Sequence, residues 1–397
     1  DPVFDDTLRH AMSVALGETP TIRIVSRERT AYALRLMRQP PGAHVAGEVA
    51  RQVCRRVGAD MVVAGDIAKV GEQFVLIAEA TLCSSGAPLA QARATAEGKD
   101  RVLAALNRVA AGLRNELGEA PSQERNAASR VEDVTTADLG ALQAFTLATD
   151  ALAERKVMEA ITLYTHAIDI DPGFALAHSR LGSTLAGLRE WKRANQHRQR
   201  ALELAEGLTE RERFYLNATS RLGQGRAAEA EEILKVWARL YPGDRVPLGW
   251  LAVSHLNRGE RTQAMSWGQA AVRIDPTPGT LVNLGAVYLN MGRLADARSV
   301  TEGLSEPGFR YLLAFLDGDA SEMERQASGV PPGSVEELDM RAREAQAAMA
   351  AGRLRAGRQL VGRAETLGLQ LGLLALTSQV LATHAVWESE VGDPRLA

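Results

Sequence analysis

The side chains that could do chemistry are scattered along the chain and form no catalytic set. No Gly-rich loop precedes a strand lysine, and no His-Arg-Asp or Asp-Phe-Gly motif is present, so the constellation of a protein kinase is missing. Gly223-Gln-Gly225 lies between two helical patterns, which indicates a hairpin turn rather than a phosphate cradle. The sequence therefore predicts a non-enzymatic segment without a cofactor.

Metal-binding patterns are equally sparse. His-Glu-x-x-His is absent, and we interpret the histidines as residues of helix surfaces or helix contacts rather than as bases or ligands. Asp169 and Asp171 precede Pro172 at the end of a helical pattern, which favours solvated or capping roles over a calcium site. The seven histidines stand at positions 10, 44, 166, 178, 197, 255 and 384.

The two cysteines, Cys54 and Cys83, allow two interpretations. They are either two small buried apolar side chains or the partners of one disulfide, which needs an oxidising compartment. Two cysteines alone cannot build a structural zinc site, and no histidine stands at ligand spacing from them. We therefore predict no metal site.

The densest basic run offers a candidate surface. We interpret it either as the solvated outer face of one helix or as a patch for an acidic partner segment. Nucleic acid is disfavoured, because no platform of several aromatic residues interleaves with the basic ones and the formal net charge is −3. The candidate patch consists of Arg189, Lys192, Arg193, Arg198 and Arg200, with His197 among them.

Residues 1–118 alternate between helical and strand-like periods. We predict an α+β domain, a small mixed sheet covered by helices. A linker over 119–137 follows, poor in large apolar residues. The first predicted helix starts near Phe4, and the others are Arg27–Met37, Val45–Val57 and Arg101–Leu117. The predicted strands are Thr21–Ser26, Met61–Val70, Gln73–Cys83 and Leu89–Ala96.

From residue 138 onward the pattern is helical and repeats. Pro242 and Pro276 end similar segments 34 residues apart, and Pro172 lies about two such periods earlier. This period is typical of tetratricopeptide (TPR) repeats, in which Gly or Ala on one helix meets a bulky group on the other. We predict about five repeats over 138–305 and degenerate TPR-like hairpins over 306–397, together an all-α solenoid.

The first helices of such repeats line a groove. Their side chains either pack one repeat on the next or bind an extended or helical peptide. The Lys, Arg and Asn clamp for a terminal carboxylate is not matched. The candidate groove residues are Phe145, Thr149, Ser179, Ser183, Tyr215 and Thr219.

The run from Ala59 to Ala80, followed by Ser85-Gly86, resembles the TolB-like α/β domain. Three further features, Asp1-Pro-Val-Phe-Asp-Asp-Thr-Leu, the segment Met37–Pro41 with Cys54, and Leu240-Tyr-Pro-Gly-Asp, resemble the sensor half of bacterial, acidobacterial-type serine/threonine protein kinases. The resemblance implies a kinase domain and a membrane span upstream, a strand just before Asp1, and an extracytoplasmic location that favours the disulfide. Winged-helix regulators and adenylate cyclases carry similar halves.

Two functional hypotheses follow. The first is a non-catalytic scaffold or sensor region of a bacterial signalling protein that binds a protein or peptide in its groove. The alternative is a structural protein that assembles into oligomers or filaments through solenoid stacking and strand exchange. No stretch reaches about 18 uninterrupted apolar residues, so we expect no membrane insertion by this segment.

Overall fold

The computed structural model describes residues 2–17, 22–40, 45–118, 136–204 and 208–391. They divide into two compact units. Unit 1 comprises residues 1–183 and 195–291, and unit 2 comprises residues 184–194 and 292–397.

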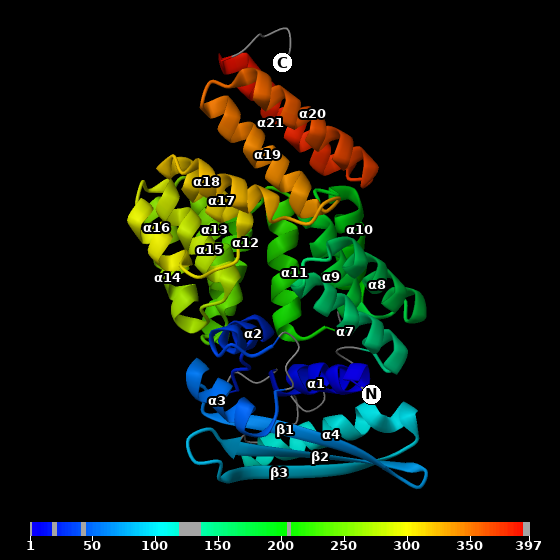
Figure 1. Cartoon of the computed structure of the whole chain (residues 1–397). Coiled ribbons are helices and arrows are strands. Elements are labelled where there is room, and N and C mark those ends of the chain that lie inside the picture. Colours follow the sequence, from blue (N-terminus) through cyan, green and yellow to red (C-terminus); the bar gives the residue numbers. More distant parts are fainter. Residues whose placement is uncertain (1, 18–21, 41–44, 119–135, 205–207, 392–397) are drawn as a thin grey trace. The chain divides into compact units, whose positions relative to one another are not determined.

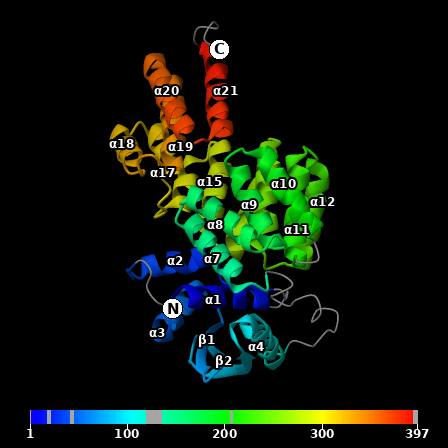
Figure 2. The same cartoon turned by 90° about the vertical axis from the view of Figure 1, so that its right-hand side faces the viewer.

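A three-stranded antiparallel meander organises the first part of unit 1 (Figure 1). Its strands are β1 (Met61–Val70), β2 (Gln73–Leu82) and β3 (Pro88–Glu97), in the order β1-β2-β3. Val70 pairs with Gln73 across the two-residue turn Gly71-Glu72, and Gly71 supplies the positive φ of 64°. Helix α4 (Val102–Glu116) packs against β2 and β3, as Figure 2 also shows.

The sheet is antiparallel rather than mixed, because residues 22–26, the described part of the expected strand Thr21–Ser26, form no strand. Residues 22–26 belong to neither a helix nor a strand, and they lie between α1 (Pro2–Gly17) and α2 (Arg27–Leu36). The alternating apolar side chains face different surroundings, since Val25 packs on a cluster of α2 and α3 (Gly47–Val57), whereas Ile24 is 40% exposed. The remaining strand predictions and the helix predictions of this region are confirmed within one to two residues.

Helix α1 joins the sheet region to the helical repeats of unit 1. It packs against both α4 and α7 (Leu139–Ala153). Arg114 of α4 donates a hydrogen bond to the carbonyl oxygen of Ala15 (2.9 Å), and Arg211 of α11 donates one to that of Gly17 (3.2 Å). Arg29 of α2 forms an ion pair with Asp275 at 3.4 Å.

Helical hairpins of the TPR type make up the rest of the described chain, as predicted. The predicted linker lies outside the described residues except for positions 136 and 137. After α7 the helices are α8 (Val157–Ile170), α9 (Ala175–Gly187), α10 (Trp191–Glu203), α11 (Glu210–Gly223), α12 (Ala227–Leu240), α13 (Arg245–Asn257), α14 (Arg261–Ile274), α15 (Pro278–Asn290), α16 (Leu294–Thr301), α17 (Pro307–Asp317), α18 (Ala320–Ser328), α19 (Val335–Ala350), α20 (Leu354–Gln370) and α21 (Leu374–Val391). Within unit 2, α20 and α21 lie side by side (Figure 2).

Small residues allow the paired helices to approach. Ala160, Ala194, Ala230 and Ala264 hold the same position in four successive second helices, and each is 0% exposed. The turn between the helices of a hairpin needs one residue of positive φ. Glycine supplies it in the third and fourth hairpins, and Arg155 (φ 65°) and Arg189 (φ 64°) supply it in the first two.

Candidate functional site

The first predicted groove position is covered by the chain itself. Phe145 of α7 is 1% exposed. Its ring lies 5.4 Å from that of His10 on α1, 5.4 Å from that of Tyr164 and 5.0 Å from that of Phe174, measured between centroids. The α1 helix therefore covers part of the Phe145 ring at the first hairpin.

A polar and aromatic cluster crosses the next three first helices, α9, α11 and α13. Arg180 of α9 forms an ion pair with Glu212 of α11 at 2.6 Å. The Tyr215 hydroxyl of α11 donates a hydrogen bond to Ser183 Oγ of α9 at 3.0 Å. The Arg180 guanidinium lies 5.8 Å from the Tyr215 ring centroid, and the Trp250 ring of α13 meets that of Tyr215 edge-on at 6.4 Å. We call these five residues the inner-face cluster.

The inner-face cluster keeps part of its surface accessible. The Arg180 side chain is 37% exposed and that of Glu212 is 15% exposed, while Ser183, Tyr215 and Trp250 are half-buried. The negative charge of Glu212 raises the pKa of Arg180 and so favours the charged form of the guanidinium. Tyr, Trp and Arg dominate the binding energy of protein interfaces when they are partly accessible and well packed.

The six predicted groove residues fall into two groups. Ser183, Tyr215 and Thr149 are half-buried, and the Thr149 hydroxyl lies 3.2 Å from that of Tyr164. Ser179 (0% exposed) and Thr219 (3% exposed) are internal, like Phe145. The structure thus brings two predicted residues, Ser183 and Tyr215, together with Arg180, Glu212 and Trp250, which the sequence interpretation did not select.

Four members of the predicted basic patch are exposed: Arg189, Lys192, Arg193 and Arg200. Arg200 pairs with Glu203 at 3.2 Å. The prediction that Arg198 shares this surface is wrong, because Arg198 is only 6% exposed. The helical period explains the difference, since positions 194, 198 and 201 lie on one face, and Ala194 and Ala201 are both fully buried.

Cys54 of α3 and Cys83, which directly follows β2, are paired as a disulfide in the structure. Their Cα atoms are 5.9 Å apart, and 29 residues separate them in sequence. This separation of the Cα atoms lies in the usual range for a disulfide. The bridge would tie α3 to the end of the central strand.

The other singled-out polar residues have structural roles. Asp171 accepts hydrogen bonds from the Gly173 amide (2.9 Å) and the Thr136 hydroxyl (2.6 Å), as a capping residue does. His178 and His197 face each other with 3.0 Å between their Nδ1 atoms. Within the described ranges, no group of three or more His, Cys, Asp or Glu side chains could hold a metal ion. None of the described helices is both long and apolar enough to cross a membrane.

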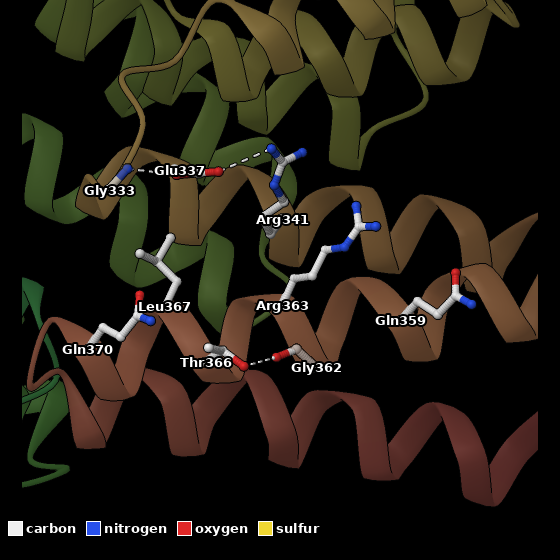
Figure 3. Close-up of a pocket in the computed structure, with 9 residues that line it drawn as sticks. All are labelled: Gly333, Glu337, Arg341, Gln359, Gly362, Arg363, Thr366, Leu367 and Gln370. Atoms are coloured by element: carbon white, nitrogen blue, oxygen red, sulfur yellow. Dashed lines mark hydrogen bonds and ion pairs between the residues drawn. The ribbon is translucent and has the colours of Figure 1, made fainter.

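A separate pocket of about 600 Å³ lies on α19 and α20 in unit 2 (Figure 3). Glu337 accepts hydrogen bonds from the Gly333 amide at 2.8 Å and from Arg341 at 3.1 Å, so the Arg341 charge facing the pocket is paired with that of Glu337. Arg363 is exposed on α20. The other lining residues are Gln359, Gly362, Thr366, Leu367 and Gln370. The lining residues of this pocket include none of the aromatic kind found in the inner-face cluster.

No family model and no curated protein matches the chain. Several solved structures are similar to parts of the chain at low identity. A thermophilic TPR protein of Thermus thermophilus is 21% identical, covering 47% of this chain and 97% of its own, with a TM-score of 0.34. The type IV pilus biogenesis factor PilW is 14% identical over 61% and 98% of the two chains (TM-score 0.32). PilF of Pseudomonas aeruginosa is 19% identical over 51% and 97% (TM-score 0.33).

Proposed function

We propose that this chain is the non-catalytic binding region of a bacterial signalling protein, and that its inner-face cluster binds a peptide segment of a partner protein. The observation that carries the proposal is the contact of Arg180, Tyr215 and Trp250 across three successive first helices. These side chains combine large apolar area with hydrogen-bonding groups, and each stays partly accessible. An extended or helical peptide laid across the first helices would contact all three.

The signalling role and the location rest on the residues of the α/β region. The resemblance to TolB-like domains and to kinase sensor halves favours a region outside the cytoplasm, with the output domain elsewhere in the protein. The pairing of Cys54 with Cys83 supports this location, because disulfides persist in oxidising compartments. Targeting of a reporter fusion of the full-length protein to the periplasm or cell surface would test it.

The binding proposal is tested with a phage-displayed library of random dodecamer peptides panned on the whole chain. We expect enriched peptides whose affinity falls at least tenfold in Tyr215→Ala and in Trp250→Ala, because hot-spot truncation costs about 2 kcal/mol or more. Trp191→Ala is the matched control, since Trp191 is 46% exposed and lies on α10, outside the cluster. Equal affinity of all three variants, or no enriched peptide, would refute the proposal.

Self-association is a second candidate, favoured by the apolar surface of α21. Leu374 is 61% exposed, Val386 56% and Leu381 36%. Exposed apolar side chains of this kind gain free energy when a second surface covers them. Light scattering of wild type and Leu374→Glu decides this candidate, with a concentration-dependent dimer expected only for the wild type. A monomer at all concentrations would exclude it.

A further inference from the structure

One arginine of unit 1 occupies a core position that is uncharged in the neighbouring repeats. The residue four places after the buried alanine of each second helix is Tyr164 in the first hairpin, Leu234 in the third and Gly268 in the fourth. In the second hairpin it is Arg198. Tyr164 is 1% exposed, Leu234 is 0% and Arg198 is 6%, so the guanidinium stands where its counterparts pack inside the repeats.

Arg198 has no anionic partner among the described residues. Its Nε atom is buried without a hydrogen-bond acceptor. Burial lowers the pKa of the Arg198 guanidinium, which shows that the surroundings disfavour its charge. A Cβ at Gly223 would lie 3.6 Å from Nη1, so the side chain reaches the last residue of α11. The partial negative charge at that helix end offsets only a fraction of a full positive charge.

The repeat register relates Arg198 to a residue of the inner-face cluster. In the first hairpin, Tyr164 reaches Thr149, fifteen residues earlier, with 3.2 Å between the hydroxyl oxygens. The residue fifteen places before Arg198 is Ser183, which accepts the hydrogen bond of Tyr215. Burial lowers the pKa of Arg198, and Tyr215 lies near enough to act on that pKa in the opposite direction. Arg198 therefore belongs to the neighbourhood of Ser183 and Tyr215, behind the accessible surface.

The charge balance of this neighbourhood leaves one cation uncompensated. Arg180 is neutralised by Glu212, whereas Arg198 is not paired with any described carboxylate. An unpaired buried charge destabilises a fold, and Leu234 shows that an apolar side chain suits the same position. Departures from a local packing rule of this kind are expected at functional sites.

We propose that Arg198 recognises a carboxylate of the bound peptide, an aspartate or glutamate side chain that completes the charge balance beside Ser183 and Tyr215. The inference rests on the proposed peptide function and specifies its ligand as acidic. One unpaired guanidinium matches a single negative charge, which favours a carboxylate over a dianionic phosphate. A hydrogen bond between two charged groups is also stronger than one between neutral groups.

The test uses peptides enriched from the dodecamer library, resynthesised with each Asp or Glu replaced by Asn or Gln, and in one series by phosphoserine. We expect one acidic position whose amide replacement weakens binding to the wild type about tenfold or more. Arg198→Leu, which installs the residue of the third hairpin, should unfold no more easily than the wild type and should bind the acidic and amide peptides equally. Arg239→Leu is the control, because Arg239 is exposed on α12.

The outcomes separate the two proposals. Enriched peptides that show no acidic preference, or an acidic preference that survives in Arg198→Leu, would overturn the inference and leave the peptide function standing. Tighter binding of the phosphoserine peptide would also overturn the carboxylate assignment. If no peptide is enriched, the peptide function falls. The melting temperatures of the wild type and of Arg198→Leu are then compared in sodium acetate and in sodium chloride at equal ionic strength. The inference requires that acetate raise the melting temperature of the wild type but not that of Arg198→Leu, and equal changes in the two proteins refute it.

Discussion

Acidification should loosen the contact between α1 and α7, and His10 is the group responsible. Its ring packs on Phe145, and its Nε2 atom is buried without a hydrogen-bond partner in the described structure. Burial, together with the positive charges of Arg27 and Arg180, lowers the pKa of His10 to about 4 from its ordinary 6.5. Protonation in the packed position would place a third cation near two arginines.

The size of the effect follows from linkage between proton binding and folding. The folded pKa is the lower one, so the unfolded chain binds the proton more tightly and stability falls as the pH drops from 6.5 toward 4. With pKa values of 6.5 and about 4 and 1.36 kcal/mol per pKa unit, the loss between pH 7 and pH 5 is at most about 2 kcal/mol. Partial exposure of the ring reduces this figure.

The assay is urea unfolding of the wild type and His10→Gln at pH 7 and pH 5. The wild type should lose up to about 2 kcal/mol more than the variant between the two pH values, because Gln cannot be protonated. Asp150, which pairs with Arg27 and whose pKa is raised by burial, titrates in both proteins and cancels in the comparison. His166→Gln, on the exposed side of α8, should behave like the wild type. An equal pH dependence of wild type and His10→Gln would refute the reasoning.

Three further predictions concern stability. In unit 2, Glu388→Gln should lower the free energy of unfolding in urea by about 3 kcal/mol, because breaking a buried ion pair is costly. The fully buried Glu388 carboxylate accepts hydrogen bonds from Arg358 at 2.7 and 2.8 Å. A change below about 1 kcal/mol contradicts this prediction. Gly368→Ala should lower the free energy of unfolding by about 1–3 kcal/mol, because the added methyl group collides with Thr377 of α21. Adding Thr377→Ala should restore most of this stability. If the effects of the two substitutions simply add, the contact between the two positions is contradicted. Closing the loop between Cys54 and Cys83 should contribute about 3–4 kcal/mol in the loop-entropy description, so reduction should lower the melting temperature of the wild type but not of Cys54→Ser/Cys83→Ser; free thiols in the unreduced, unfolded protein would show that the bond does not form.

The repeat architecture could be predicted because its physical cause is local. Close helix packing requires small residues at fixed intervals, and Ala160, Ala194, Ala230 and Ala264 record that interval directly in the sequence. The hairpins β1-β2 and β2-β3 could also be predicted from the sequence, since short turns such as Gly71-Glu72 pair neighbouring strands. The expected strand at Thr21–Ser26 failed because alternation reports a half-buried extended segment and does not reveal whether a pairing partner exists.

The candidate site could be predicted only in part from the sequence. The repeat register identified Ser183 and Tyr215, but the cover that α1 places over Phe145 joins residues more than a hundred positions apart and leaves no periodic signal. The pairing of Arg180 with Glu212 could have been found by comparing first helices one repeat apart. Arg198 was assigned to a surface because it lies in a run of basic residues, although its register matches that of Tyr164 and Leu234.

Within unit 1, the inner-face cluster and the α/β region meet through adjacent residues of α11. Glu212 faces Arg180, while Arg211 binds Asp244 at 2.7 Å and the carbonyl oxygen of Gly17 at 3.2 Å. Asp244 is buried, so Arg211 cannot leave it without exposing an unpaired charge to a poorly solvated site. A peptide that shifted the start of α11 would therefore have to move Gly17, and with it the end of α1, or break a buried ion pair. For the proposed peptide function, these contacts of Arg211 would provide a physical link between a peptide on the inner-face cluster and the α/β region.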